Sequence, residues 1–506
     1  MKIINKIVCT FMKRSISEVK YWLNHPHDAQ KQTFDYLIKT AQNTTFGKKY
    51  HFTNIKNVED FKRQVPINDY DSLKDLIQDN LKGKQNVLWP EPIHWFAMSS
   101  GTTSDKSKFV PVSPSSMKKN HYKAGRELIA TYLHNKPTSN LFAGRTLIMG
   151  GSHNIASINQ QAKYGDLSAV LLQNMPFIGR TFMTPELPVL LMDKWEKKIE
   201  AIANRTIKQS LTNVSGVPTW VMVLFKHILQ KTNKSNILEV WPALELYMHG
   251  GVSFTPYRQQ FEQILPSEKV SFIQSYNASE AFLGFQDTLK TDRHDMALLM
   301  NHGTFYEFLP LDQLGEKHPK TLQLSEVQTG VNYAIVISTN AGLWRYLIGD
   351  TVQFSTLNPY RIKVSGRTKH FINAFGEEII IDNADKAVAK ACQITKGKIK
   401  EYTAAPIYFS EDKKGSHEWL IEFEKTPTDL EAFRVLLDQN LQQLNSDYEA
   451  KRRKDMAMTL PVLTTVPDGT FHEWLKIKGK LGGQHKVPRL ANNRRFLEEI
   501  KSLVTS

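Results

Sequence analysis

The chain has 506 residues and a mass of 58.0 kDa, more than a single hydrophobic core of about 250 to 300 residues accommodates, so at least two domains are expected. Its composition, 41% hydrophobic and 23% charged, is that of a globular protein and excludes long disorder. The formal net charge of +15 raises nucleic-acid binding as an alternative. However, the densest basic run, residues 451–454, has no interleaved aromatic residues and indicates a solvated helix surface. No nucleic-acid partner is therefore predicted.

The first 14 residues are basic and apolar, which raises the possibility of a signal peptide. Asn5, Lys6 and Thr10 interrupt the apolar run and no small-residue cleavage site follows, so a short amphipathic helix is predicted instead. No run of about 18 apolar residues occurs, so no membrane span is expected, and the default location is the cytoplasm. Cys9 and Cys392 lack metal-ligand or redox spacing, and His25 and His27 have no third ligand at zinc spacing.

Helical and strand patterns then alternate along the chain. The spacing predicts helices over 15–48, 69–83, 193–212 and 218–231, and strands near 145–150, 244–249, 269–274, 303–310, 332–338 and 343–354. Ser365 and Gly366 are expected to interrupt a strand, and a smaller α+β unit follows, with strands at 419–424 and 458–466 and helices at 429–445 and 493–503. The prediction is an α/β protein with a large N-terminal domain, 1–368, and a smaller C-terminal domain, 369–506.

A hydroxyl-rich loop, residues 99–108, has the chemistry of a triphosphate cradle. A glycine lets the backbone approach a phosphate, hydroxyls and amides donate hydrogen bonds, and two lysines balance charge. It is not a Walker loop, because the spacing of that motif is absent, and a dinucleotide-binding Gly-x-Gly-x-x-Gly motif after a strand is absent too. Taken alone, a loop of this composition is more typical of an ordinary surface turn.

Two carboxylates follow strand-like segments downstream. Glu280 ends the segment 269–280 and offers a hard oxygen suited to Mg²⁺ held between protein and phosphates. Asp350 follows the run 343–349 and can accept both hydroxyls of a ribose. Gly250 and Gly251 end another strand and could let a flat base lie against the backbone. Each of these residues taken singly also fits a solvated or turn position.

Five motifs in order resemble the auxin-responsive Gretchen Hagen acyl acid amido synthetases, a family within the superfamily of acyl-CoA ligases, adenylation domains and luciferases. They are Ser-Ser-Gly-Thr-Thr-Ser at 99–104, Tyr-x-x-Ser-Glu at 276–280, Gly-Leu-Trp-Arg-Tyr-x-Ile-Gly-Asp at 342–350, the segment 366–378, and Gly-Gln-His-Lys-Val-Pro-Arg at 483–489. The chain looks like a bacterial-type member, and the resemblance runs from about residue 65 to about residue 495.

The resemblance implies a role for each matched position. The β and γ phosphates of ATP would be held by Ser99, Ser100, Gly101, Thr102, Thr103, Ser104 and Lys108. Gly250 and Gly251 would flank the adenine, Tyr276 and Ser279 would position the nucleotide, Glu280 would bind Mg²⁺, and Asp350 would bind the ribose. The catalytic set would be Lys486, Glu280 and Arg367, with Lys369 at a hinge between the domains. Lys476, Lys478 and Lys480 lie near Lys486 in the sequence and are alternatives to it.

The implied activity is ATP- and Mg²⁺-dependent adenylation of a small carboxylic acid, followed by transfer of the acyl group to the amine of an amino acid. The acid pocket would be lined from residues 150–152, 164–177 and 214–225. Two alternatives remain open: an acyl-CoA ligase that uses the same adenylate with a thiol acceptor, and a noncatalytic nucleotide-binding protein. Beyond the two substrates, a monomer or weak homodimer is expected.

Overall fold

The computed structural model describes residues 2–100, 107–149, 155–192, 195–252, 254, 257–266, 268–289, 294–316, 318–368, 371–409, 414–455, 457–478 and 487–505. The chain divides into two compact units. The first contains residues 1–99, 109–254 and 258–368, and the second contains residues 100–108, 255–257 and 369–506. A mixed α/β first unit and a smaller α+β second unit are the fold class that the sequence predicts.

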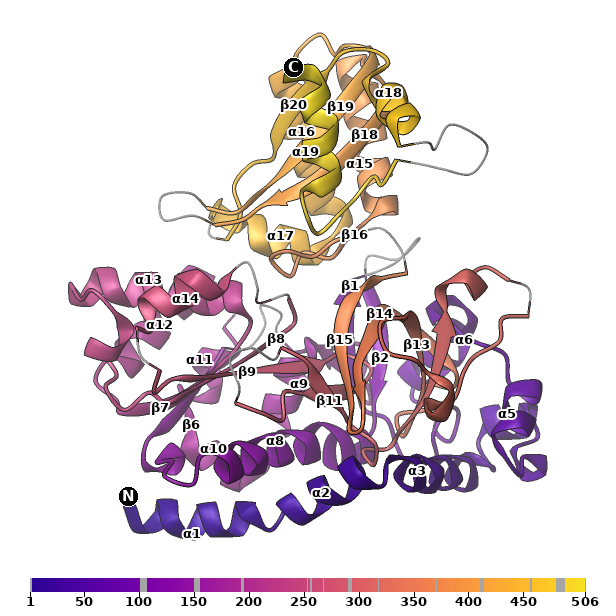
Figure 1. Ribbon diagram of the computed structural model, residues 1–506, viewed down its shortest axis with the longest axis vertical. Coiled ribbons are helices and arrows are strands. Elements are labelled where there is room, and N and C mark those ends of the chain that lie inside the picture. Colours follow the sequence, from indigo (N-terminus) through magenta and orange to yellow (C-terminus); the bar gives the residue numbers. More distant parts are fainter. Residues whose placement is uncertain are drawn as a thin grey trace. The chain divides into compact units, whose positions relative to one another are not determined.

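The N-terminal third of the first unit is mainly helical (Figure 1). Its helices are α1 (Lys2–Lys13), α2 (Ile16–Asn24), α3 (Pro26–Ala41), α4 (Thr45–Lys49), α5 (Val58–Gln64) and α6 (Tyr70–Leu81). The predicted helix over 15–48 is divided at Pro26, because proline lacks an amide hydrogen and favours the first turn of a new helix. Asp69 begins α6 as a capping box, in which its carboxylate accepts the Ser72 amide at 2.9 Å.

An eleven-stranded sheet forms the centre of the first unit, in the order β12-β13-β14-β15-β11-β10-β9-β8-β7-β3-β6. Strands β6, β3, β7, β8 and β9 pair in parallel, and the remaining pairs are antiparallel. The bounds are β3 (Arg145–Ile148), β6 (Met183–Thr184), β7 (Leu211–Ser215), β8 (Leu246–Gly250), β9 (Ser271–Asn277), β10 (Phe282–Phe285), β11 (Met296–Leu298), β12 (Thr304–Pro310), β13 (Asn332–Thr339), β14 (Tyr346–Leu357) and β15 (Tyr360–Arg367).

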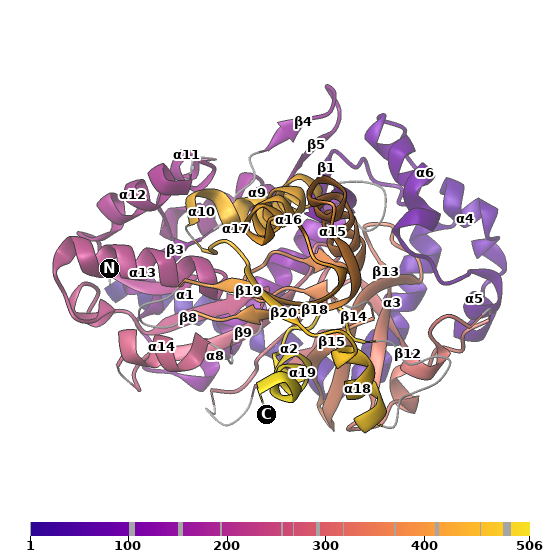
Figure 2. The ribbon, with the colours of Figure 1, turned by 90° about the horizontal axis from the view of Figure 1, so that it is seen from above.

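Helices cover both halves of this sheet. Figure 2 shows α12 and α13 beside the parallel half and α3, α4 and α5 beside the antiparallel half. The helices are α7 (Pro114–Ser116), the π-helix η2 (Met117–His121), α8 (Tyr122–Asn135), α9 (Leu167–Gln173), α10 (Phe177–Phe182), α11 (Leu187–Leu190), α12 (Trp195–Thr206), α13 (Pro218–Thr232) and α14 (Arg258–Ile264). Single 3₁₀ turns are η1 (Phe52–Asn54), η3 (Leu141–Ala143), η4 (Ile237–Glu239), η6 (Leu311–Gln313) and η7 (Leu324–Glu326).

A second sheet of four strands, in the order β2-β1-β5-β4, carries the segments on either side of the hydroxyl-rich loop. Its strands are β1 (Trp95–Ser100), β2 (Ser107–Val112), β4 (Ala156–Ser157) and β5 (Lys163–Gly165). Strand β1 pairs in parallel with β5 and lies next to β2, so the loop 101–106 joins two neighbouring strands.

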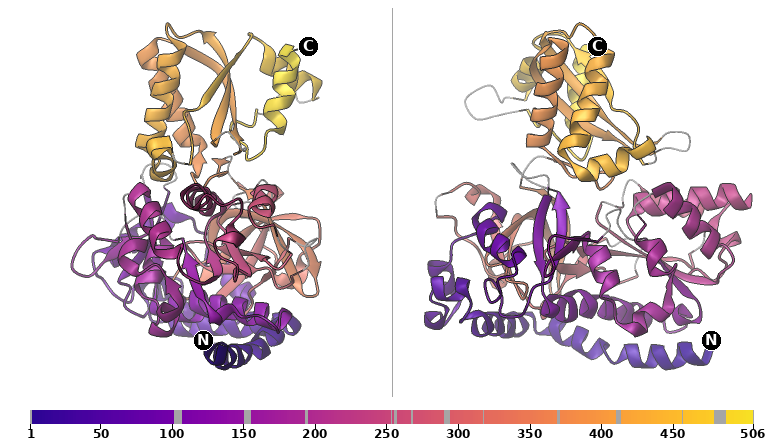
Figure 3. Two further views of the ribbon diagram at one scale, coloured as in Figure 1. Left: turned by 90° about the vertical axis from the view of Figure 1, so that its left-hand side faces the viewer. Right: turned by 180° about the vertical axis from the view of Figure 1, so that it is seen from behind.

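The second unit is a three-stranded sheet, β18-β19-β20, between two pairs of helices (Figure 3). Helices α15 and α16 pack against each other, while α18 and α19 bury Trp474, Leu497 and Ile500 with Leu420 of the sheet. The elements are β16 (Phe371–Ile372), β17 (Ile379–Ile380), α15 (Ile381–Thr395), β18 (Lys398–Ile407), β19 (Ser416–Lys425), α16 (Leu430–Leu444), α17 (Ser446–Arg452), η8 (Arg453–Asp455), β20 (Val462–Val466), α18 (Thr470–Ile477) and α19 (Arg495–Thr505).

Sequence predictions differ from the structure at three places outside the site. The helix predicted over 193–212 ends at Thr206, and residues 211–215 form β7 instead. Strand β15 does not end at Ser365 and Gly366, because β14 pairs with it as far as Arg367, although the register shifts at Ser365, between the Thr351–Gly366 and Val352–Val364 pairs. The basic run 451–454 is not a solvated surface throughout, since Lys451 and Arg452 are 6% and 8% exposed. The Arg452 guanidinium forms hydrogen bonds of 2.6 and 3.0 Å with the buried carboxylate of Asp438, which removes this part of the run from a nucleic-acid surface.

Candidate functional site

Asp350 and Arg367 face each other across two antiparallel strands. They are register partners in β14 and β15, and Arg367 Nε donates to Asp350 Oδ1 at 2.6 Å. Asp350 lies within β14 rather than at its end, directly after Gly349, whose φ of +98° a side chain would disfavour. The carboxylate is 7% exposed, and the arginine compensates the cost of burying its charge.

Tyr276 completes this cluster from a distant strand. Its hydroxyl donates to Asp350 Oδ2 at 2.6 Å, although β10, β11 and β15 separate β9 from β14 in the sheet order. The sheet must therefore curl so that β9 returns toward β14. Burial raises the pKa of Tyr276 well above its usual value, and the charge of Asp350 and the hydrogen bond to it act in the same direction. Tyr276 is thus a neutral hydrogen-bond donor.

The beginning of β14 is anchored by residues from the N-terminal part of the chain. Asn68 pairs with it as a parallel bridge, donating its amide to the Arg345 carbonyl and accepting the Leu347 amide, both at 2.8 Å. Trp344 packs in the core against Phe52, with ring centroids 4.8 Å apart. These contacts with the 342–350 motif hold the beginning of β14 in place, and Asp350 with it.

Arg345 of the same motif is part of this support. Its guanidinium donates to both carboxylate oxygens of Glu307, at 2.8 to 3.2 Å, and to the carbonyls of Lys62 and Val65. Both charged side chains are at most 5% exposed. A bidentate, fully satisfied pair of this kind fixes strand geometry, so the motif divides into structural residues and one cluster residue, Asp350.

The ends of β8 and β9 lie beside Tyr276. Gly250 pairs with Ser275, and a Cβ at Gly250 would lie only 2.4 Å from the Ser275 carbonyl oxygen. Gly251 has a φ of +82°. Ser279 and Glu280 follow β9 in a half-buried bend, and the charge of Glu280 contributes to the raised pKa values of Tyr276 and Tyr346. Of the predicted residues that the structure describes, Gly250, Tyr276, Glu280, Asp350 and Arg367 are brought together.

His121 also joins this region, and sequence reasoning did not single it out. Its Nδ1 lies 3.1 Å from Asn277 Oδ1, next to Tyr276. The imidazole is 4% exposed, and burial lowers its pKa to about 4, so it is neutral near pH 7 and Nδ1 donates to the amide oxygen. No motif in the sequence marks a histidine in a helix for this role.

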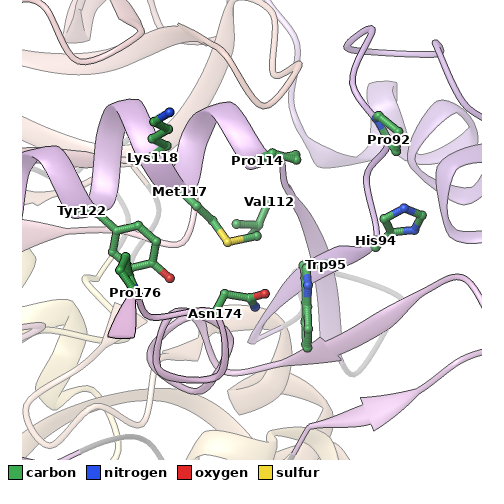
Figure 4. Close-up of a pocket in the computed structure, with 10 residues that line it drawn as sticks. All are labelled: Pro92, His94, Trp95, Val112, Pro114, Met117, Lys118, Tyr122, Asn174 and Pro176. Atoms are coloured by element: carbon green, nitrogen blue, oxygen red, sulfur yellow. The ribbon is translucent and has the colours of Figure 1, made fainter. Parts of the chain in front are cut away.

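A cavity of about 440 Å³ is lined in part by the same helical segment (Figure 4). Met117 and Tyr122 point into it from η2 and α8, and Trp95 closes it from β1. The complete lining is Pro92, His94, Trp95, Val112, Pro114, Met117, Lys118, Tyr122, Asn174 and Pro176. It overlaps the predicted acid-pocket range 164–177, whereas Trp220 and Phe225 from the range 214–225 are core residues, 3% and 0% exposed.

Several predicted positions lie outside the described residues. These are Gly101, Thr102, Thr103 and Ser104 of the loop, the hinge residue Lys369, Lys486 with its alternative Lys480, and residues 150–152 of the predicted acid pocket. Ser99 and Ser100 end β1, and Lys108 lies in β2. Among the residues that the structure describes, no group of three or more histidine, cysteine, aspartate or glutamate side chains could hold a metal ion by itself. No described helix is long and apolar enough to cross a membrane.

Solved structures share this fold. The chain aligns over 98% of its length, and 97% of the other chain, with "AtGH3.15 acyl acid amido synthetase in complex with 2,4-DB" at a TM-score of 0.64 and 16% identity. It aligns with a 2-hydroxyisobutyryl-CoA ligase complex over 95% of its length and 92% of the other chain, with a TM-score of 0.58 and 13% identity. The fold is thus the one found in adenylate-forming ligases.

Sequence comparison identifies the family. Family models match the GH3 family N-terminal domain at residues 15–270, the GH3 family central domain at 297–367 and the GH3 family C-terminal domain at 382–495. The chain belongs to the GH3 family, which confirms the resemblance seen in its motifs. It is 23% identical to "Indole-3-acetic acid-amido synthetase GH3.3" of Arabidopsis thaliana over 94% of this chain and 91% of that protein. It is 22% identical to "4-substituted benzoates-glutamate ligase GH3.12" of the same plant, over 55% of this chain and 51% of that protein.

Proposed function

We propose that this chain is an ATP-dependent acyl acid amido synthetase. It activates a small carboxylic acid as the acyl-adenylate, releases pyrophosphate, and transfers the acyl group to the amine of an amino acid. The observation that carries the proposal is the buried cluster of Tyr276, Asp350 and Arg367 in a chain of the GH3 family. The acid and the amino acid are the substrates.

The cluster has the donors and acceptors that a nucleotide needs. Tyr276 and Arg367 each occupy one lone pair of the Asp350 carboxylate, and its remaining lone pairs can accept two ribose hydroxyls. The family resemblance implies that Gly250 and Gly251 would flank the adenine at the end of β8, where Gly250 lets β8 and β9 approach closely. Glu280, one bend after β9, would share Mg²⁺ with the phosphates, which suits an ion that binds one or two carboxylates plus phosphate oxygens. Magnesium, when bound, neutralises charge on the phosphates.

The reaction itself needs positioning and charge stabilisation rather than a protein nucleophile. A carboxylate oxygen of the acid forms a bond to the α-phosphorus while the bond from that phosphorus to pyrophosphate breaks. Charge develops on the phosphoryl oxygens, where Arg367 and the hydroxyl-rich loop 99–108 would stabilise it. The amine then attacks the acyl carbon, AMP leaves, and the amine proton passes to a base or water. The family resemblance adds Lys486 to this catalytic set.

The cavity beneath η2 is where the acid would bind. Its lining of Trp95, Met117 and Tyr122 is apolar, and Lys118 lies at its edge. Its volume suits a small aromatic or aliphatic acid. In this proposal, residues 1–368 form the domain that binds ATP and the acid. Residues 369–506 would be a mobile small domain that turns at Lys369 between the two half-reactions.

Isotopic exchange of pyrophosphate into ATP tests the proposal, with Mg²⁺ and a panel of small carboxylic acids. Acid-dependent exchange is expected in the wild type. It should fall at least about a hundredfold in Glu280→Ala, because a ligand to the metal is lost. Glu262→Ala, at an exposed position of α14, should retain the wild-type rate. Amino acids and coenzyme A, added separately, then identify the acceptor, and product only with coenzyme A would favour the acyl-CoA ligase. If no acid supports exchange and ATP does not bind in calorimetry, the proposal is wrong.

A further inference from the structure

Helix α1 packs on the first unit with a defined orientation. It lies against α8 and η3, and Asn5 fixes its rotation. The Asn5 side chain donates to the Ser139 carbonyl at 3.2 Å and accepts the Phe142 amide at 2.9 Å, and both of its polar groups are therefore satisfied. Cys9 and Met12 pack against the core on this inner side. The opposite side of α1 is consequently directed away from the unit.

That outer side carries large apolar side chains. Ile7 is 64% exposed and Phe11 is 60% exposed, and they lie one helical turn apart. The Arg14 guanidinium stands 6.0 Å from the centroid of the Phe11 ring. An isolated exposed apolar residue on a protein surface is common, but an Ile and a Phe on one helical face, beside a cation, form a specific surface. We call Ile7, Phe11 and Arg14 the α1 face.

The sequence of the segment that carries the α1 face is strongly basic. Residues 2–24, which span α1 and α2, contain five basic side chains, Lys2, Lys6, Lys13, Arg14 and Lys20, and one acidic side chain, Glu18. The Glu18 carboxylate forms an ion pair with Lys123 of α8 at 3.2 Å. Arg126, exposed on α8, donates to Ser15 at the junction of α1 and α2. The helix therefore combines apolar and basic groups, with no acidic residue of its own.

We propose that the α1 face docks this protein on an anionic phospholipid bilayer. Ile7 and Phe11 would enter the boundary between headgroups and acyl chains, while the basic residues of 2–24 contact lipid phosphates. A second copy of the chain suits the face less well, because a symmetric contact would bring these basic residues together. Nucleic acid would satisfy the charge but gives Ile7 no apolar environment. The inference is independent of the proposed enzymatic activity.

Sedimentation of the full-length protein with vesicles tests the proposal. Phosphatidylcholine vesicles with and without phosphatidylserine are compared, at low and high salt. The wild type should bind the vesicles containing phosphatidylserine at least about ten times more tightly than the neutral ones, and salt should weaken this binding. The double variant Ile7→Ser and Phe11→Ser should lose about ten-fold in affinity. Arg14→Glu should lose affinity for anionic vesicles only.

Ile477→Ser is the matched control, because Ile477 in α18 is also 60% exposed but lies in the second unit. It should bind as the wild type does. All variants should unfold at the wild-type temperature, which separates loss of binding from loss of structure. Absence of wild-type binding, equal binding to neutral vesicles, or equal losses in the Ile477 control and the double variant would overturn the proposal. So would a dimer, seen by light scattering, that becomes a monomer in the double variant.

Discussion

Tyr276 and Arg367 hold the Asp350 carboxylate between them, and each contributes one hydrogen bond of 2.6 Å. The strength of this arrangement comes from its charge, because hydrogen bonds to an ionised group are about twice as strong as neutral ones. The carboxylate is therefore fixed in one orientation before a ligand arrives. Preorganisation of this kind reduces the entropy that ribose binding has to overcome.

Tyr276→Phe removes one of the two donors and leaves the ring in place. We expect KM for ATP to rise about ten-fold in pyrophosphate exchange, which corresponds to about 1.5 kcal/mol for a charge-assisted hydrogen bond. Tyr360→Phe is a suitable control, because the Tyr360 hydroxyl contacts His27 at 3.3 Å, away from the cluster. An unchanged KM for ATP in Tyr276→Phe would contradict the role of the cluster.

His121 links the pH to the stability of the protein. Burial lowers its pKa in the folded state to about 4 from an ordinary value of 6.5, so the unfolded chain binds more protons as the pH falls. Its contribution to stability is present above pH 6.5 and is lost as the pH falls toward 4. Integrated between about pH 8 and about pH 5, the loss amounts to about 2 kcal/mol.

Urea unfolding of wild type and His121→Gln at these two pH values measures that contribution. The free energy of unfolding should fall less in the variant, by about 2 kcal/mol, since the titrating group is absent. His134→Gln, at an exposed position of α8, should show the wild-type pH dependence. Equal pH dependence in all three proteins would show that His121 is not buried as described.

At the scale of elements, the close approach of β8 and β9 depends on Gly250. A Cβ there would lie 2.4 Å from the Ser275 carbonyl oxygen, which belongs to the backbone of the paired strand and cannot rotate away. The end of β8 would have to shift, and Gly251 with the following turn would move with it.

Gly250→Ala should therefore destabilise the protein by about 1 to 3 kcal/mol, as overpacking generally does, and weaken ATP binding. Gly125→Ala is the matched control, because no heavy atom lies within 4 Å of the position that the added methyl group would take in α8. That substitution should raise stability by up to about 1 kcal/mol through helix propensity. Urea unfolding and titration calorimetry with ATP measure the two effects, and normal ATP binding in Gly250→Ala would contradict the argument.

The elements also show how far local pattern predicts structure. Helix α6 is predicted because Asp69 and the apolar spacing after it are local signals. The continuation of β15 through Ser365 and Gly366 cannot be predicted from local signals, because pairing with β14 decides it. Likewise, the charges of Lys451 and Arg452 predict side chains exposed to solvent. The fold instead buries both side chains and brings Asp438 to Arg452.

At the scale of the whole molecule, the two compact units contain separate hydrophobic clusters. One includes Trp22, Trp89 and Trp344 in the first unit, and another includes Trp474 and Ile500 in the second. Because each unit has its own core, scanning calorimetry should resolve two unfolding transitions.

Saturating ATP with Mg²⁺ should raise the transition of the first unit, which contains Tyr276, Asp350 and Arg367. At a ligand concentration of about 100 times Kd the stabilisation is about 2.7 kcal/mol, enough for a shift of about three to four degrees. A single cooperative transition would contradict the expectation of separate units. If ATP raised the unfolding temperature of Asp350→Ala as much as that of the wild type, the assignment of the ligand site would be wrong.

The sequence by itself determined the family, the α/β class, many element positions and the candidate residues Gly250, Tyr276, Glu280, Asp350 and Arg367. Motif spacing, helix caps and hydrophobic periodicity are properties of short segments, so they can be recognised without the fold. Only the tertiary structure decided that Tyr276 bonds to Asp350, that His121 supports Asn277, and that Arg345 serves β14 through Glu307. These contacts join residues 38 to 156 positions apart, and they depend on the curl of a sheet whose long-range pairing no local pattern encodes.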